Sequence, residues 1–164
     1  MITFKEKLFR KSVLFVVGFC LYITIETCFR GYSYPLMGIL GGLFLLIIDP
    51  INDRIRWDID ILLYGCIGSA IITTMELVVG ETIKLLGLTQ MWDYSNLPLN
   101  FDGVICVPFS ILWIGMSIIG IFIADAINYY VFEDTEIPHY VLFGRIILIF
   151  KIKKCQMNPK HTDK

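Results

Sequence analysis

The sequence predicts an all-α membrane protein with four transmembrane helices arranged as two repeated helix pairs. Of its 164 residues, 56% are hydrophobic and only 18% are charged, whereas a soluble domain has about 25% charged residues. Four stretches, 12–25, 31–48, 61–75 and 103–124, contain no charged residue, which is typical of membrane spans. This composition excludes an ordinary soluble domain, and its hydrophobicity excludes a disordered chain.

The first predicted span covers residues 12–29 and is interrupted by Glu26. Four basic residues precede it, as in a signal peptide, but no small-residue cleavage site follows, so we expect the segment to be retained. The second span, residues 32–48, has 17 residues, or about 25 Å of helix, the short end for a span.

The third predicted span begins at residue 59 or 61 and ends near residue 83, interrupted by Glu76 and Glu81. The fourth covers residues 103–124. The next apolar stretch, 140–150, has 11 residues and includes Arg145; it is too short to span, so we predict an interfacial helix. Residues 1–150 would then form a single transmembrane helical domain, and 151–164 a basic polar cytoplasmic tail.

The distribution of basic residues predicts the orientation. With four spans and a cytoplasmic N-terminus, 12 of the 14 Lys and Arg residues fall on the inner side, and only Arg30 and Lys84 fall outside. Because short inner loops are enriched in Lys and Arg, both termini should face the cytoplasm of a multi-pass protein in the cell membrane.

A weak internal repeat appears at an offset of 50 residues. Gly18, Thr24 and Glu26 fall on Gly68, Thr74 and Glu76, and the flanking residues are similar. We interpret this as a duplication that gave spans 1–2 and spans 3–4, although two apolar helices also share Gly and Thr by chance.

Two acidic residues, Glu26 and Glu76, fall inside predicted spans at similar depths, roughly 21–23 Å from the inner surface. An intramembrane carboxylate indicates a functional site by default. The nearest basic candidates are Arg30, at i+4 from Glu26, and Lys84, about two turns after Glu76. Three readings stay open: acids that reach the interface or are protonated, structural ion pairs, and contacts to a substrate or coupling ion.

The outer loop at residues 90–103 is the most distinctive segment. Trp92 and Tyr94 suit the membrane interface. Asp93, Ser95 and Asn96 suit Asx-type turns, and Pro98 suits another turn. The loop either returns the chain to the membrane or covers a cavity that includes Glu76 and Glu26. On the fourth span Ser110, Trp113 and Ser117 share one face, which either lines a pore or packs against another helix.

The inner loop at residues 49–60 carries Arg54, Arg56 and Trp57. These residues would dock a soluble partner or lie at lipid headgroups. The sequence leaves open whether Cys28 and Cys106, near the same predicted surface, form a disulfide.

The sequence contains no motif for P-loop ATP hydrolysis or for zinc-dependent peptidase activity. The sequence contains neither GxxxxGK[ST] nor HExxH, and its two histidines have no catalytic arrangement. We therefore expect no enzyme, no cofactor, no metal site and no nucleic-acid partner; the expected partners are the lipid bilayer and other subunits of an oligomer.

The third-to-fourth-span region resembles a known family. The run Trp92-Asp93-Tyr94-Ser95-Asn96-x-Pro98-x-Asn100-x-x-Gly103, continuing to Trp113, is similar to the signature of the bacterial family described as putative ABC-transporter type IV. Glu26-x-x-x-Arg30-Gly31 and Glu76-x-x-x-Gly80 also match family positions, whereas Tyr34 and Pro35 depart from the family's His and Trp.

This resemblance, over about residues 15–125, implies a permease-like subunit of a transporter that works with a separate cytoplasmic ATPase. The sequence thus predicts a transporter subunit with an outward-facing site formed by Glu26, Arg30, Glu76, Trp92, Asp93, Tyr94 and Asn100. The alternative is a non-transporting structural or regulatory protein that binds another membrane protein.

Overall fold

The protein is a small helical bundle, described here from a computed structural model that covers residues 4–54, 59–133 and 136–151. Its four main helices are α1 (Phe4–Arg30), α2 (Pro35–Arg54), α3 (Ile61–Leu85) and α4 (Val107–Ala126). A π-helical turn, Ile127–Val131, prolongs α4. The bundle also carries two short antiparallel hairpins, β1 (Asn100–Phe101) with β2 (Ile105–Cys106), and β3 (His139–Leu142) with β4 (Arg145–Ile149).

Three of the helices are long and apolar enough to cross a membrane: Phe4–Arg30, Ile61–Leu85 and Val107–Val131. The fourth, α2, contains a shorter apolar stretch, Pro35–Pro50. The helical membrane class predicted from composition therefore holds in the part of the chain that the structure describes.

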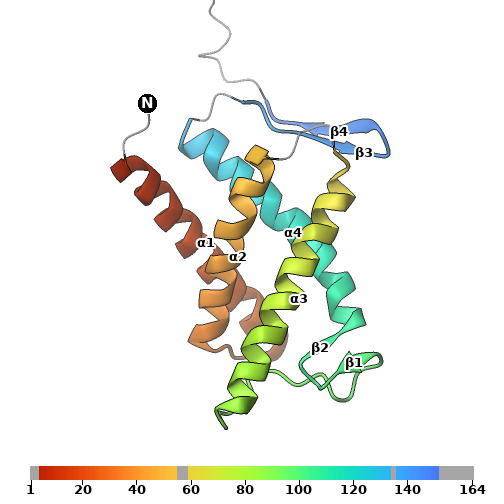
Figure 1. The fold of residues 1–164 in the computed structure, drawn as a ribbon. Helices are drawn as coiled ribbons and strands as arrows, with labels where there is room; N and C mark the ends of the chain where they lie inside the picture. Colours follow the sequence, from red (N-terminus) through yellow and green to blue (C-terminus); the bar gives the residue numbers. More distant parts are fainter. Residues whose placement is uncertain (1–3, 55–58, 134–135, 152–164) are drawn as a thin grey trace, which may run out of the picture.

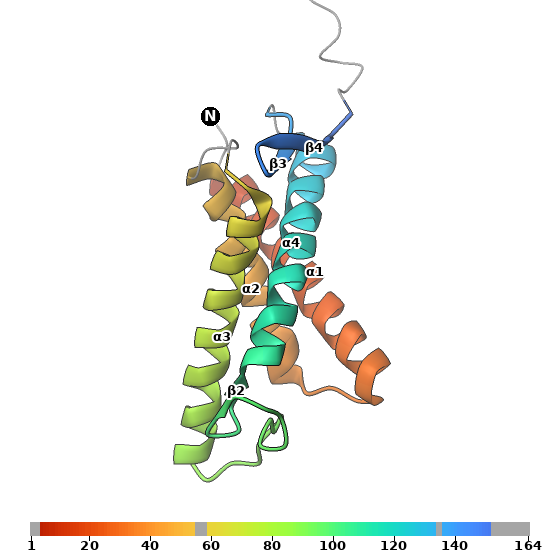
Figure 2. The same cartoon turned by 90° about the vertical axis from the view of Figure 1, so that its right-hand side faces the viewer.

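The helices pack as two hairpins, α1 against α2 and α3 against α4, which meet mainly through α2 and α4 (Figures 1 and 2). One end of the bundle, which we call the terminal end, carries the start of α1 and the β3–β4 hairpin. The opposite, or loop, end carries the turn between α1 and α2 and the loop between α3 and α4. Seen in Figure 2, α1 and α4 diverge toward the loop end.

Small residues allow the close approach within each helix pair. A Cβ atom on Gly18 of α1 would lie 2.5 Å from the Gly41 carbonyl oxygen of α2. On α3, a Cβ atom on Gly68 would lie 2.5 Å from the Ser117 side chain of α4. Backbones that approach this closely are usual where membrane helices associate through glycine.

The positions matched by the 50-residue repeat occupy similar places. Gly18 and Gly68 lie at the two helix crossings, and Thr24 and Thr74 each donate to the carbonyl four residues back at 2.7 Å. The duplication stays an interpretation, because Ser and Thr side chains outside the repeat, such as Ser12 and Thr82, also donate to the carbonyl four residues back.

Helix boundaries differ from the predicted spans. Helix α1 begins at Phe4, so its basic residues lie on the helix itself, and α2 begins at Pro35, whose fixed φ suits a first helical position. The fourth helix begins at Val107, because residues 100–106 form the β1–β2 hairpin instead.

The predicted interfacial helix at residues 140–150 is wrong, because this segment forms the β3–β4 hairpin. The run Arg145–Ile149 is rich in β-branched residues, which favour strands, and Gly144 supplies the positive φ that the turn needs. The hairpin crosses the terminal end of the bundle (Figure 1), where the Tyr140 hydroxyl donates to Asp125 of α4 at 2.6 Å.

Polar contacts at the terminal end join three helices. Arg10 of α1 donates to the Asn128 side chain at 2.7 Å, and Asn128 donates to Asp49 of α2 at 2.5 Å. Asp60 caps α3 by accepting from the Leu62 amide at 2.9 Å, and it also accepts from the Phe143 amide of the hairpin. These contacts hold the hairpin and helix ends in one arrangement.

Candidate functional site

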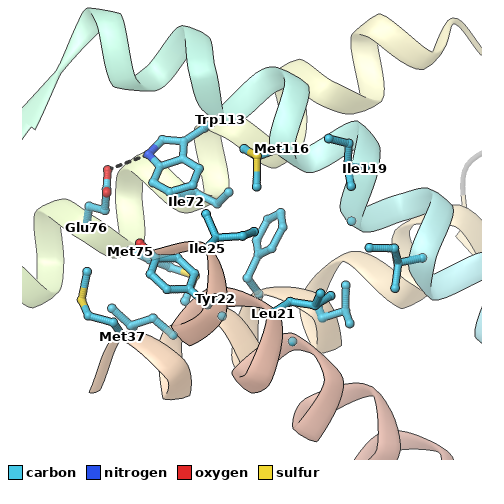
Figure 3. A pocket seen from close by; sticks show the side chains of 17 residues that line it. Leu21, Tyr22, Ile25, Met37, Ile72, Met75, Glu76, Trp113, Met116 and Ile119 are labelled. Atoms are coloured by element: carbon cyan, nitrogen blue, oxygen red, sulfur yellow. Dashed lines mark hydrogen bonds between the residues drawn. The ribbon is translucent and has the colours of Figure 1, made fainter. Parts of the chain in front are cut away.

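Glu76 lies on α3 in the interior of the bundle, with 4% of its surface exposed. One carboxylate oxygen accepts from the Trp113 indole N–H of α4 at 3.0 Å, shown as the dashed line in Figure 3. The other accepts from the Tyr94 hydroxyl at 3.2 Å. Both donors are neutral, so they orient the carboxyl group and add no opposing charge.

The loop between α3 and α4 reaches Glu76 because α3 has a glycine one turn further on. Gly80 faces Val104 and Trp92, and a Cβ atom there would overlap the Val104 side chain. Trp92 donates its indole N–H to the Val104 carbonyl at 2.8 Å, and the ring is buried. The loop therefore docks against α3 and delivers Tyr94 to the carboxylate.

Tyr94 itself is buried and stacks on Phe109 with ring centroids 4.6 Å apart. Burial first, and then the Glu76 carboxylate, raises the pKa of the Tyr94 phenol. The hydroxyl therefore stays protonated at physiological pH and serves as a hydrogen-bond donor.

Glu26 and Arg30 form an ion pair at the end of α1, with 2.6 Å between Oε1 and Nη2. The Ser33 hydroxyl also donates to Glu26. Arg30 donates to the Met91 carbonyl of the α3–α4 loop at 2.9 Å, and its guanidinium lies 4.8 Å from the Tyr32 ring centroid. The pair thus connects the two helix hairpins at the loop end.

Two adjoining cavities lie between α1 and α4. The first, about 150 Å³, is lined by Glu76 and by apolar side chains of all four helices (Figure 3). The second, about 200 Å³, extends toward the loop end and is lined by Glu26, Arg30, Trp92 and Tyr94, among others. Five residues line both cavities: Tyr22, Ile25, Met37, Trp113 and Met116.

Five of the seven predicted site residues therefore line these cavities. The other two, Asp93 and Asn100, shape the loop. Asp93 accepts from the Ser95 amide at 2.9 Å, and Asn100 donates to the Leu97 carbonyl at 2.7 Å. The hydrogen bonds from Ser95 hold the pKa of the Asp93 carboxyl below its ordinary value.

Lys84 does not pair with Glu76, contrary to the candidate raised by the sequence. Its ammonium group lies 2.6 Å from Asp102 of the loop and 3.9 Å from Glu81. The Lys84 contact lowers the pKa of the Asp102 carboxyl. Lys84 thus links α3 to the loop that follows it through an ion pair.

Several residues that line the cavities were not predicted from the sequence. Tyr22 lines both cavities and stacks against Trp113, with ring centroids 6.1 Å apart. Tyr22 lies four residues before Glu26 and therefore on the same helix face. This spacing could have predicted Tyr22 as a cavity residue. Met37 of α2 had no such signal, because nothing in the sequence aligned α2 with the site.

Ser110 and Ser117 lie in the α3–α4 interface, where Ser69 donates to the Ser110 carbonyl at 2.5 Å and Ser117 packs against Gly68. Of the predicted docking residues, Arg56 and Trp57 lie outside the described residues, and Arg54 is described only as the last residue of α2. Cys28 is exposed and Cys106 buried, and both are free thiols.

These features define a class of protein: a helical membrane protein with a mostly apolar cavity that holds a buried carboxylate and an ion pair. The family model described as putative ABC-transporter type IV matches residues 17–155, and the chain belongs to that family. No curated protein and no solved structure gives a significant match to the chain.

Proposed function

We propose that this chain is a permease-like membrane subunit of a transporter, with a substrate site that opens on the outer side of the cell membrane. The observation that carries the proposal is the buried Glu76 carboxylate at the wall of a cavity between α1 and α4. An ionisable group within a membrane helix is costly and marks a transport pathway or a polar contact.

The orientation follows from charge. Four membrane-crossing helices with both termini cytoplasmic put the terminal end inside and the loop end outside, where Arg30 and Lys84 lie. The second cavity is lined by Glu26, Arg30, Trp92 and Tyr94, which belong to this loop end, so the substrate would enter from outside, beneath the Trp92–Tyr94 segment.

The energy source would be a separate cytoplasmic ATPase, since the family is named for ABC transporters and the sequence contains no P-loop motif. The inner loop with Arg54, Arg56 and Trp57 is the proposed docking site for that partner. A single chain encloses little space, so we also propose that the working unit is a homo- or hetero-oligomer.

The decisive test compares cells that lack the chain with cells that carry it as wild type, Glu26→Gln, Glu76→Gln or the control Glu81→Gln. Glu81 lies on the same helix as Glu76 but lines neither cavity. Mass spectrometry of medium and cell extracts identifies compounds whose uptake depends on the chain. We expect at least tenfold slower uptake for the two site variants and wild-type uptake for Glu81→Gln, at equal membrane levels.

The alternative, a non-transporting membrane protein that binds another membrane protein, predicts a different result. No compound would depend on the chain, and the chain purified in mild detergent would carry a membrane partner but no ATPase. That combination would refute the transporter proposal.

A further inference from the structure

We propose that the cavity between α1 and α4 binds an organic ammonium ion with an apolar, ring-sized body, and that Glu76 is its counter-ion. The inference rests on the proposed function, because it names the substrate class of the same cavity. Three features carry it: the charge balance of the cavity, the aromatic groups in its walls, and its size.

With Glu76 ionised, the charge balance of the cavity leaves one negative charge that has no ionic partner within the described part of the chain. The charged residues that line the two cavities are Glu26, Arg30 and Glu76. Glu26 and Arg30 neutralise one another across 2.6 Å. The ion pairs recorded among the described residues do not include Glu76, whose hydrogen-bond donors are the neutral Tyr94 and Trp113.

The carboxylate also has unused acceptor capacity. A carboxylate offers about four lone-pair positions on its two oxygens, and Glu76 uses one on each oxygen. A ligand ammonium group that donates to the remaining positions would neutralise a buried charge, which makes a strong charge-assisted hydrogen bond. A ligand anion would face the repulsion of Glu76, with Arg30 already paired.

Aromatic rings form part of the walls of both cavities. Tyr22 and Trp113 line both cavities in stacked contact, and Trp92, Tyr94 and Phe109 line the second. The faces of such rings attract cations, more strongly where water is excluded. Rings and carboxylate together favour an organic cation over an equally large neutral molecule.

Size and lining favour an organic cation over calcium or magnesium. Calcium and magnesium need about six or more oxygen ligands, and the described residues contain no group of three His, Cys, Asp or Glu side chains placed to hold a metal. An apolar cavity of about 150 Å³ is large enough for a benzene ring, and the first cavity has that volume. An apolar body with one ammonium group fits both observations.

The test uses three probes of similar size: 2-phenylethylammonium, 2-phenylethanol and 3-phenylpropanoate. Binding to the full chain in detergent at pH 7 is followed by tryptophan fluorescence. A Trp57→Phe background leaves only Trp92 and Trp113 as reporters, and both line the cavities. We expect the ammonium to bind at least tenfold more tightly than the alcohol, and the carboxylate to bind most weakly.

In Glu76→Gln this preference for the ammonium should vanish, while the alcohol binds as before, which shows that the cavity is intact. The control Glu81→Gln should keep the preference. Equal affinities of the wild-type chain for ammonium and alcohol would overturn the inference, whatever the variants do. Equal affinities would overturn the ammonium specificity but would still allow the chain to transport another class of substrate. Tight ammonium binding without chain-dependent uptake would instead overturn the proposed transport function and keep the ammonium site.

Discussion

The crossing of α1 and α2 at Gly18 yields the sharpest stability prediction. The Cβ atom of a Gly18→Ala chain would lie 2.5 Å from the Gly41 carbonyl oxygen, and 3.0 Å from the Gly42 Cα and the Leu45 Cβ. Ordinary contacts of this kind begin near 3.4 Å. Two of the three atoms belong to the α2 backbone, so a side-chain rotation cannot relieve the overlap. The helices must separate there by about 1 Å, the difference between 2.5 Å and an ordinary contact of 3.4 Å.

The expected cost follows from two opposing effects. Overpacking in a close-packed interface costs about 1–3 kcal/mol. Replacing glycine by alanine within a helix returns about 0.5–1 kcal/mol, because the unfolded chain loses less entropy. Gly18→Ala should therefore lower the free energy of unfolding by up to about 2.5 kcal/mol, and by about 1 kcal/mol in the middle of these ranges.

Gly115→Ala is the matched control. Gly115 lies within α4, is exposed, and has no atom within 4 Å of an added Cβ. The same substitution there should leave stability unchanged or raise it by up to about 1 kcal/mol.

The assay is reversible unfolding in mixed micelles by titration with sodium dodecyl sulfate, followed by circular dichroism. If Gly18→Ala and Gly115→Ala unfold at the same denaturant fraction, the close α1–α2 crossing described here is wrong.

Three further predictions concern the two ends of the bundle. Arg30→Gln removes the ion pair with Glu26 and should speed proteolysis of the α3–α4 loop severalfold, because Arg30 also holds the Met91 carbonyl. Because the pKa of Asp102 is lowered, its contribution to loop order is present above the ordinary value of 3.8 and is lost as the pH falls through the lowered value. The protection of the loop amides, measured as hydrogen exchange relative to the intrinsic rate at each pH, should fall in that range. Asp102→Asn should show the low protection at every pH. Tyr140→Phe removes the hydrogen bond to buried Asp125 and should destabilise the β3–β4 hairpin by about 1–3 kcal/mol. The measurement is hydrogen exchange of the amides at residues 139–149. Unchanged exchange in the variant would show that the bond does not anchor the hairpin.

Much of the architecture was predictable because a membrane constrains the chain strongly. Uncharged stretches located the helices, since a backbone in lipid must satisfy its own hydrogen bonds. Their ends were less predictable. The β1–β2 hairpin occupies the first residues of the predicted fourth span. Its turns need positive φ values at Leu99 and Asp102, which composition does not reveal. The sequence predicted a helix where the structure has the β3–β4 hairpin, because a short apolar run does not distinguish a strand from a helix.

The candidate site was predictable in part for the same reason. Glu26 and Glu76 stood out because charge is rare within spans, and Arg30 followed from helical spacing. The predicted site included Asp93 and Asn100 as parts of the outer loop, and in the structure both hold the turns of that loop. For Asp93 the turn-forming residue types had already indicated this role. Proximity along a loop does not determine which side chains face inward.

The sequence by itself determined the membrane class, the number and order of apolar segments, the family, and the two costly carboxylates. These properties depend on composition and local spacing. Helical spacing also indicated Arg30 as the partner of Glu26, and the structure pairs the two. Only the tertiary structure decided the two partners of Glu76, which are Tyr94 and Trp113. The last two come from a loop and a helix 18 and 37 residues away, and packing between helices, which no local pattern encodes, brings them to one cavity.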